Sequence, residues 1–379
     1  MAGTEERQVE LITNYFKKMF SPTMEENEIK IYPPAEMIIP FNGREIEAAT
    51  KGLKNGKSAG ADNLHAEYIK YADSSVHENI AHILNEVAKT GNHPEELKLG
   101  LLTPVQKPNK KQKEPEILDH LRPIMLLSVL RKILTICIIQ RTWTRMKERI
   151  PHEQAAYQGG RSTTEQVLAV KLLAEKAINS SDYTIFLSLF DMSKAFDTVN
   201  RKKLFEHLEN ILTADELHLL SIITNTTRVR VKVNKTLGDV FITLIGIMQG
   251  DCLSALLFIF YLSECLRHET NRIERSEDLL VKPKYADDIT YATKHTETTE
   301  SIKKVVPEIL QTHNLMINHT KTEEFVIPKP PPPSPPPPTL DTLLAHKNDK
   351  ILWSELDWLV NYTPLLLKTT HLTGETVNC

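Results

Sequence analysis

The chain has 379 residues, of which 41% are hydrophobic and 25% charged, with a formal net charge of −3 at pH 7. This length allows two or three substructures around a core, and the charge excludes a uniformly basic surface. The first ten residues have no apolar signal core, and the longest strongly apolar run, 253–262, is about half a membrane span. The four cysteines show no C-x-x-C pair and no zinc spacing. We expect an intracellular protein without a membrane segment, and the sequence favours neither nucleus nor cytoplasm.

The first half of the chain reads mainly as helices. Residues 1–44 form a mixed leader with one amphipathic helix near 9–20. Apolar periodicity and glycine stops then predict two helices around a Gly-rich turn, a further helix ending at Gly91, a short strand broken by prolines near 100–105, and a long helix over 126–150. Between Lys98 and Arg149, twelve basic residues stand against four acidic ones. This run indicates either a solvated face or a patch that binds a polyanion.

The second half alternates strands and helices. Residues 182–193 are apolar on both faces at first and predict a central strand, and 228–247 and 282–293 predict hairpins. Helices are predicted over 252–269 and 298–315. This order is typical of an α+β fold of the split β-α-β kind. Nine of the 22 prolines follow in 328–338, as a polyproline linker or disordered insert.

Two strand ends carry carboxylates. Asp191 ends the apolar strand, with Asp197 six residues on, and Asp287 and Asp288 occupy the turn of the second hairpin. An ion at the end of a buried strand costs several kcal/mol without a partner. Asp191 as a simple helix cap is one interpretation. The other is that three carboxylates converge from adjacent strands and hold two Mg²⁺ ions.

The segments "FDMSKAFD", "GIMQGDCLSALLFIFYL" and "YADD" resemble the palm motifs of reverse transcriptases of non-LTR, LINE-type retrotransposons. "GKSAGADNLHAEYIK", "LLTPVQKP", "LRPIMLLSVLRKIL" and "AYQGGRSTTEQVL" resemble the segments that precede the palm in that family, and "LMINHTKTE" its last palm motif. The resemblance covers about residues 45–327, in the family's order. It implies a right-hand polymerase fold with fingers at 45–180 and a split β-α-β, ferredoxin-like palm at 181–327.

The resemblance implies an RNA-directed DNA polymerase that takes an RNA template, a DNA primer and dNTPs. Asp191, Asp287 and Asp288 would be the catalytic residues and the ligands of two Mg²⁺ ions, with Mn²⁺ as an alternative ion. The metals would activate the primer 3′-hydroxyl and hold the triphosphate.

Further roles follow from the same resemblance. Phe196 would exclude a ribose 2′-hydroxyl, although a plain core phenylalanine is the alternative. Gln249 and Gly250 would line the nucleotide and template, or form a simple turn. The remaining implied contacts are basic or aromatic: Lys107, Arg122 and Lys321 on the nucleotide phosphates, and Tyr285 and Arg161 on the primer and template. The alternatives are a solvated turn lysine at Lys321 and a plain strand aromatic at Tyr285.

The C-terminal part departs from the family pattern. After the proline-rich linker at 328–340, the tail at 341–379 shows neither a primer-gripping hairpin nor a helical thumb, so we expect a truncated thumb. Two other functions stay open: an inactive retroelement remnant that only binds nucleic acid, and, less favoured because of Phe196, an RNA-dependent RNA polymerase. An SH3 or WW partner of the proline tract is the alternative to a passive spacer.

Overall fold

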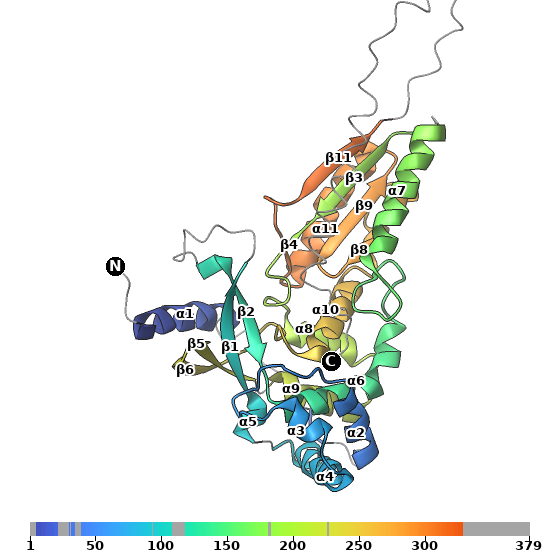
Figure 1. Cartoon of the computed structure of the whole chain (residues 1–379). Helices are drawn as coiled ribbons and strands as arrows, with labels where there is room; N and C mark the ends of the chain where they lie inside the picture. Colours follow the sequence, from blue (N-terminus) through green and yellow to red (C-terminus); the bar gives the residue numbers. More distant parts are fainter. Residues whose placement is uncertain are drawn as a thin grey trace, which may run out of the picture.

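The computed structural model describes residues 5–21, 30, 32–34, 39–92, 94–107, 118–180, 183–225 and 227–328. Its helices surround two main sheets (Figure 1). The α-helices are α1 Glu5–Phe20, α2 Gly43–Lys51, α3 Ala66–Lys70, α4 Ser74–Thr90, α5 Glu95–Lys98, α6 Val129–Lys147, α7 Thr163–Ser180, α8 Arg201–Leu208, α9 Ala214–Asn225, α10 Cys252–Cys265 and α11 Thr296–Thr312. Short 3₁₀ helices are η2 Leu118–His120, η3 Glu269–Asn271 and η4 Ser276–Asp278.

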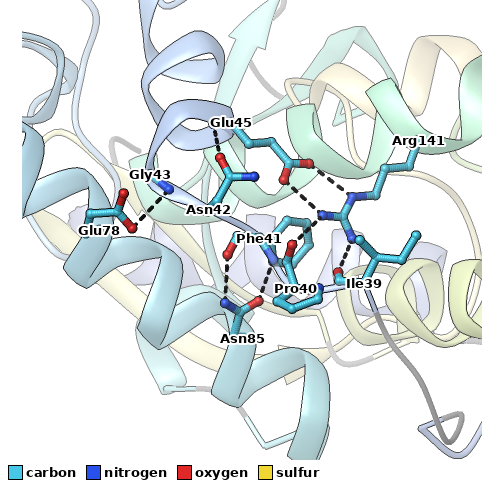
Figure 2. A network of polar contacts seen from close by, with 9 residues as sticks. All are labelled: Ile39, Pro40, Phe41, Asn42, Gly43, Glu45, Glu78, Asn85 and Arg141. Carbon is cyan, nitrogen blue, oxygen red and sulfur yellow. Dashed lines mark hydrogen bonds and ion pairs between the residues drawn. The ribbon is translucent and has the colours of Figure 1, made fainter.

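The predicted helices of the first half are confirmed. Helix α1 buries Val9, Phe16 and Phe20 on one face, as its amphipathic pattern requires. Helix α4 stops at Gly91, whose φ of 67° lies in the left-handed region that glycine adopts without strain. The chain before α2 is fixed between α4 and α6 by the polar network of Figure 2.

In that network Asn85 of α4 accepts a hydrogen bond from the Phe41 N–H at 2.7 Å and donates to the Phe41 carbonyl at 2.9 Å. Arg141 of α6 donates to both carboxylate oxygens of Glu45, at 3.0 and 2.9 Å, and its guanidinium lies 4.0 Å from the Phe41 ring centroid. Both backbone polar groups of the buried residue Phe41 are therefore paired by one side chain (Figure 2).

The first sheet has the strand order β2-β1-β5-β6. Its strands are β1 Leu99–Gln106, β2 Leu121–Leu126, β5 Arg228–Val233 and β6 Thr236–Ile242. The predicted hairpin at 228–247 is confirmed, although its second strand ends at Ile242, and its first strand runs parallel to β1. The helix expected from residue 126 begins at Val129, because Leu121–Leu126 pairs with β1 instead. Helix α1 covers this sheet, where Phe16 and Phe20 pack with Leu102 and Val229.

The second sheet has the order β11-β3-β9-β7, with β8 also paired to β9. Its strands are β3 Ile185–Phe190, β7 Leu279–Val281, β8 Lys284–Tyr285, β9 Asp288–Thr293 and β11 Glu323–Ile327, and a two-stranded sheet joins β4 Met192–Ser193 to β10 Met316–Ile317. The succession β3, α10, β8–β9, α11, β11 is the expected split β-α-β pattern in a mixed α+β fold. The predicted central position of β3 is confirmed.

The two faces of this sheet are covered by different helices (Figure 1). On one face Leu187 and Ala292, which are register partners, pack against Ala174 and Ala177 of α7. On the other face Phe190 and Tyr291 meet edge to face, at 5.9 Å between ring centroids, beneath α11. Burial on both faces explains why β3 is apolar at every position except Ser188.

The β5–β6 hairpin lies within the interval expected for the palm, yet it is hydrogen-bonded to β1 in the first sheet. The boundary between fingers and palm at residue 180 stays a prediction. Apart from residue 328, the proline-rich linker at 328–340 and the tail at 341–379, for which a truncated thumb is only an expectation, lie outside the described residues. None of the described helices is long and apolar enough to cross a membrane.

Candidate active site

The second hairpin presents two carboxylates at one end of the second sheet. Strands β8 and β9 pair Tyr285 with Asp288, leaving Ala286 and Asp287 as the two-residue turn. Ala286 has a φ of 53°, a left-handed conformation that is costly for a residue with a Cβ. The predicted hairpin with aspartates at its turn is confirmed.

Asp191 reaches the same end of the sheet from β3. Phe190, the last residue of β3, pairs with Ile289, the second residue of β9, so Asp191 follows directly beside Asp288. The Asp191 carbonyl accepts a hydrogen bond from the Asn318 N–H at 2.7 Å. The topology therefore brings together the three aspartates that the sequence indicated.

These carboxylates perturb one another. Burial raises the pKa of Asp287, and the nearby charge of Asp191 adds to the rise. Burial likewise raises the pKa of Asp288, with further contributions from Asp287 and Asp191. Like charges that share a partly buried site disfavour ionisation of each other, and a divalent cation removes that penalty.

The donor set fits Mg²⁺ in its chemistry, because it consists of carboxylate oxygens only. Within the described ranges, however, no group of three or more His, Cys, Asp or Glu side chains is arranged so that it could hold a metal ion. Lys321 instead donates to both carboxylate oxygens of Asp191, at 3.1 Å each. The Lys321 ammonium thus occupies the Asp191 carboxylate, where it would compete with a metal ion. Lys321, which was predicted to contact the nucleotide phosphates, contacts a carboxylate of the site in this structure.

A group of basic side chains adjoins the carboxylates. Burial lowers the pKa of Lys107, and the charges of three neighbouring cations, Arg122, Lys194 and Lys321, lower it further. Lys107 follows β1 and Arg122 lies in β2, so the first sheet contributes two of the four. The concentration of positive charge suits a triphosphate.

Lys194 was not among the residues predicted for the site. It lies in the loop after Asp191 with a φ of 51°, and its ammonium bonds Asp119 at 2.7 Å and the Tyr15 hydroxyl at 3.0 Å. Tyr15 in turn donates to Asp119 at 2.5 Å. Helix α1 is therefore tied to the edge of the site through Lys194. The only sign of this contact in the sequence is that Lys194 lies within the segment "FDMSKAFD".

Phe196 is half-buried, with one face of its ring stacked on Phe258 at 4.3 Å between centroids. This packing fits both interpretations of Phe196, as core residue and as wall of a nucleotide pocket.

Gln249 and Gly250 contact strand β2. The Gln249 carbonyl accepts a hydrogen bond from the Met125 N–H at 2.8 Å. Gly250 has a φ of 115°, and a Cβ there would lie 2.5 Å from the Met125 carbonyl oxygen. The Gln–Gly pair therefore joins the palm motif to β2 and requires glycine at its second position.

Asp197 is fully buried and accepts one hydrogen bond, from the Gln249 amide at 3.1 Å. Burial raises the pKa of this carboxyl to about 7, against the smaller opposing effects of the Gln249 hydrogen bond and two lysines. The side chain links the first palm motif to the Gln–Gly pair. The sequence showed Asp197 in a motif, but its partner was not predictable from spacing.

Two residues predicted to contact primer or template have other partners. Arg161 donates to Glu165 at 2.6 Å and to the His152 carbonyl at 2.9 Å, so its guanidinium is held within the chain. Tyr285 packs against the main core cluster from β8. A cavity is lined by Tyr285 and Asp288 together with Thr163 and Gln166 of α7.

Comparison with known proteins identifies the family of the chain. Residues 105–353, more than half of the chain, match the family described as "Reverse transcriptase (RNA-dependent DNA polymerase)". The chain belongs to the reverse transcriptase family.

The chain has distant relatives among retrotransposon polymerases. It is 25% identical over 270 residues to a probable RNA-directed DNA polymerase from transposon X-element of Drosophila melanogaster, covering 68% of this chain and 29% of the relative. It is 24% identical over 303 residues to the RNA-directed DNA polymerase from mobile element jockey of Drosophila melanogaster, covering 77% of this chain and 32% of the relative. An uncharacterised 149 kDa protein of transposon TX1 from Xenopus laevis is 25% identical over 256 residues, covering 66% and 19%. The chain thus spans about a third or less of each relative's length.

Among solved structures, apo telomerase from Candida tropicalis matches with a TM-score of 0.49 and 15% identity, covering 66% of this chain and 49% of that one. A form of the same telomerase truncated from its C-terminal domain gives a TM-score of 0.45 at 16% identity, covering 71% and 58%.

Proposed function

We propose that this chain is the RNA-directed DNA polymerase domain of a retroelement, with right-hand fingers and palm. The observation that carries the proposal is the convergence of Asp191, Asp287 and Asp288 at one end of a split β-α-β sheet, beside four cations. Carboxylates that raise one another's pKa suit a pair of divalent cations, and the adjacent positive charges suit a triphosphate. Family membership supports the same function.

In this mechanism Asp191, Asp287 and Asp288 would hold two Mg²⁺ ions. When bound, these ions supply a lowered pKa for the primer 3′-hydroxyl and neutralise charge on the triphosphate. Lys107 and Arg122 position the triphosphate from the first sheet, and we add Lys194 to this set. Lys321, once released from Asp191, would donate a proton to the leaving pyrophosphate.

The remaining side chains would shape the nucleotide pocket. Phe196, held by stacking one ring face on Phe258, would block a 2′-hydroxyl on the incoming sugar and so favour dNTPs over NTPs. Gln249 and Gly250 line the pocket floor, where β2 approaches the backbone closely. Tyr285 would pack beside the primer terminus. Arg161 would reach the template only after it leaves Glu165.

Primer extension tests the proposal. The purified chain receives an RNA template with an annealed DNA primer, dNTPs and Mg²⁺, in parallel with Asp287→Asn. Asp239→Asn is the matched control, because it makes the same change on an exposed residue of β6. We expect extension by wild type and Asp239→Asn, and none by Asp287→Asn. Primer–template binding without extension in wild type would overturn the proposal in favour of a remnant that only binds nucleic acid.

A further inference from the structure

One glutamine outside the predicted site is bonded to the turn that carries Asp287. Gln154 is fully buried, and its side chain makes three hydrogen bonds. Its Oε1 accepts from the Ala286 N–H at 2.9 Å and from the Ala156 N–H at 3.1 Å. Its Nε2 donates to the Ala286 carbonyl at 3.2 Å. Both backbone groups of the residue before Asp287 are therefore held by one amide.

The glutamine is itself fixed by its backbone. The Lys284 N–H donates to the Glu153 carbonyl at 2.9 Å, and the Ala155 N–H donates to the Lys284 carbonyl at 3.0 Å. Residues Gln154 and Lys284 thus form a parallel bridge, so the segment before α7 lies along β8 like a short extra strand. The segment that carries Gln154 is therefore attached to β8 by backbone hydrogen bonds on both sides of this residue.

The turn needs such support. Ala286 holds a left-handed φ of 53°, and a two-residue hairpin in that conformation normally selects glycine. An amide that satisfies both the N–H and the carbonyl of Ala286 stabilises this conformation against relaxation. The direction in which the Asp287 carboxylate points depends on the backbone that Gln154 holds.

We propose that Gln154 is a positioning residue that clamps the Ala286–Asp287 turn in the conformation required for metal-dependent nucleotide transfer. The proposal rests on the function proposed above and adds a residue to it. A merely structural role is the competing explanation, because a buried, satisfied amide also stabilises the fold. The two differ in what a loss of Gln154 does to metal binding when the fold is intact.

The test variant is Gln154→Met, which keeps the length of the side chain and removes all three hydrogen bonds. Gln158→Met is the matched control, since Gln158 donates to the Gln154 backbone carbonyl at 2.5 Å without touching the turn. Gln154→Met combined with Ala286→Gly is the rescue, because glycine adopts the left-handed conformation without a clamp. Mn²⁺ binding is followed by electron paramagnetic resonance, and single-dNTP addition by rapid quench.

We expect Gln154→Met to weaken Mn²⁺ binding at least fivefold and to lower kcat at least tenfold. The KM for dNTP and the Kd for primer–template should stay within twofold of wild type. Gln158→Met should match wild type in both assays, and the double variant should recover most of the lost Mn²⁺ affinity.

Unchanged Mn²⁺ affinity in Gln154→Met would overturn the clamp. So would equal losses in Gln154→Met and Gln158→Met with lowered melting temperatures and no rescue by glycine. If wild type binds Mn²⁺ but adds no nucleotide, the proposed polymerase function fails. Even then, the Mn²⁺ affinity of Gln154→Met relative to that of wild type decides whether Gln154 positions the carboxylates.

Discussion

Replacing Asp197 by asparagine should change how the stability of the protein depends on pH. The Asp197 carboxyl is fully buried with Gln249 as its hydrogen-bond donor, and burial raises its pKa from 3.8 to about 7. Between these two values the folded state binds more protons at this group than the unfolded state does. Wild type therefore loses stability as pH rises from about 4 to about 7, and Asp197→Asn lacks that contribution.

The size of the effect follows from the pKa difference. Between pH 5 and pH 8 the contribution of one such group changes by about two pKa units, or on the order of 2 to 3 kcal/mol. The amide oxygen introduced by Asp197→Asn would still accept the Gln249 hydrogen bond, and any fixed cost of the extra amide hydrogens is the same at every pH. Contributions from Asp287 and Asp288 are present in both proteins, so they cancel in the difference.

Urea denaturation at pH 5, 6, 7 and 8 measures the free energy of unfolding of both proteins. We expect the stability of Asp197→Asn relative to wild type to rise by about 2 to 3 kcal/mol from pH 5 to pH 8. Most of the rise should occur below pH 7. If the free energies of unfolding of the two proteins differ by the same amount at every pH, the pKa of Asp197 is not raised by its burial and the reasoning is refuted.

Three further predictions concern selectivity, stability and metal linkage. Phe196→Val should lower the preference for dNTP over NTP at least tenfold in kcat/KM, and an unchanged ratio would favour a plain core role. Asn85→Ala should lower the free energy of unfolding by about 2 kcal/mol, because it leaves the Phe41 N–H and carbonyl unpaired (Figure 2). Equal stability of this variant in urea would contradict that reasoning. Mg²⁺ should raise the melting temperature more at pH 8 than at pH 5.5, because protons compete with the ion for the Asp287 and Asp288 carboxylates at the lower pH. A shift in melting temperature that is independent of pH, or that persists in Asp287→Asn, would show that the ion binds elsewhere.

Much of the second sheet was predictable from the sequence because its signals are local. An apolar run ending at Asp191 identified a central strand, and a polar turn between β-forming segments identified the hairpin of Asp287. The helix ending at Gly91 was equally predictable, since glycine at that position has a specific backbone reason. The local pattern does not predict that these two strands are neighbours; that expectation came from the family resemblance, and the pairing of β3 with β9 agrees with it.

What escaped prediction depends on contacts between distant segments. Strand Leu121–Leu126 is short and contains proline, so it becomes a strand only through its pairing with β1. The parallel pairing of β5 with β1 joins segments more than a hundred residues apart, which periodicity does not reveal. Likewise the partners of Lys194 and Gln154 come from α1 and from the turn after β8, and neither spacing nor composition indicates them.

Single-nucleotide addition by wild type and Asp191→Asn tests the central claim most directly. Each protein is bound to a DNA primer on an RNA template and mixed with the next complementary dNTP and Mg²⁺, with EDTA in a parallel reaction. We predict that wild type extends the primer by one residue, that EDTA abolishes the reaction, and that Asp191→Asn is at least a thousandfold slower while it binds the primer–template equally well. Extension by Asp191→Asn at the wild-type rate would contradict the assignment of these carboxylates as the catalytic centre.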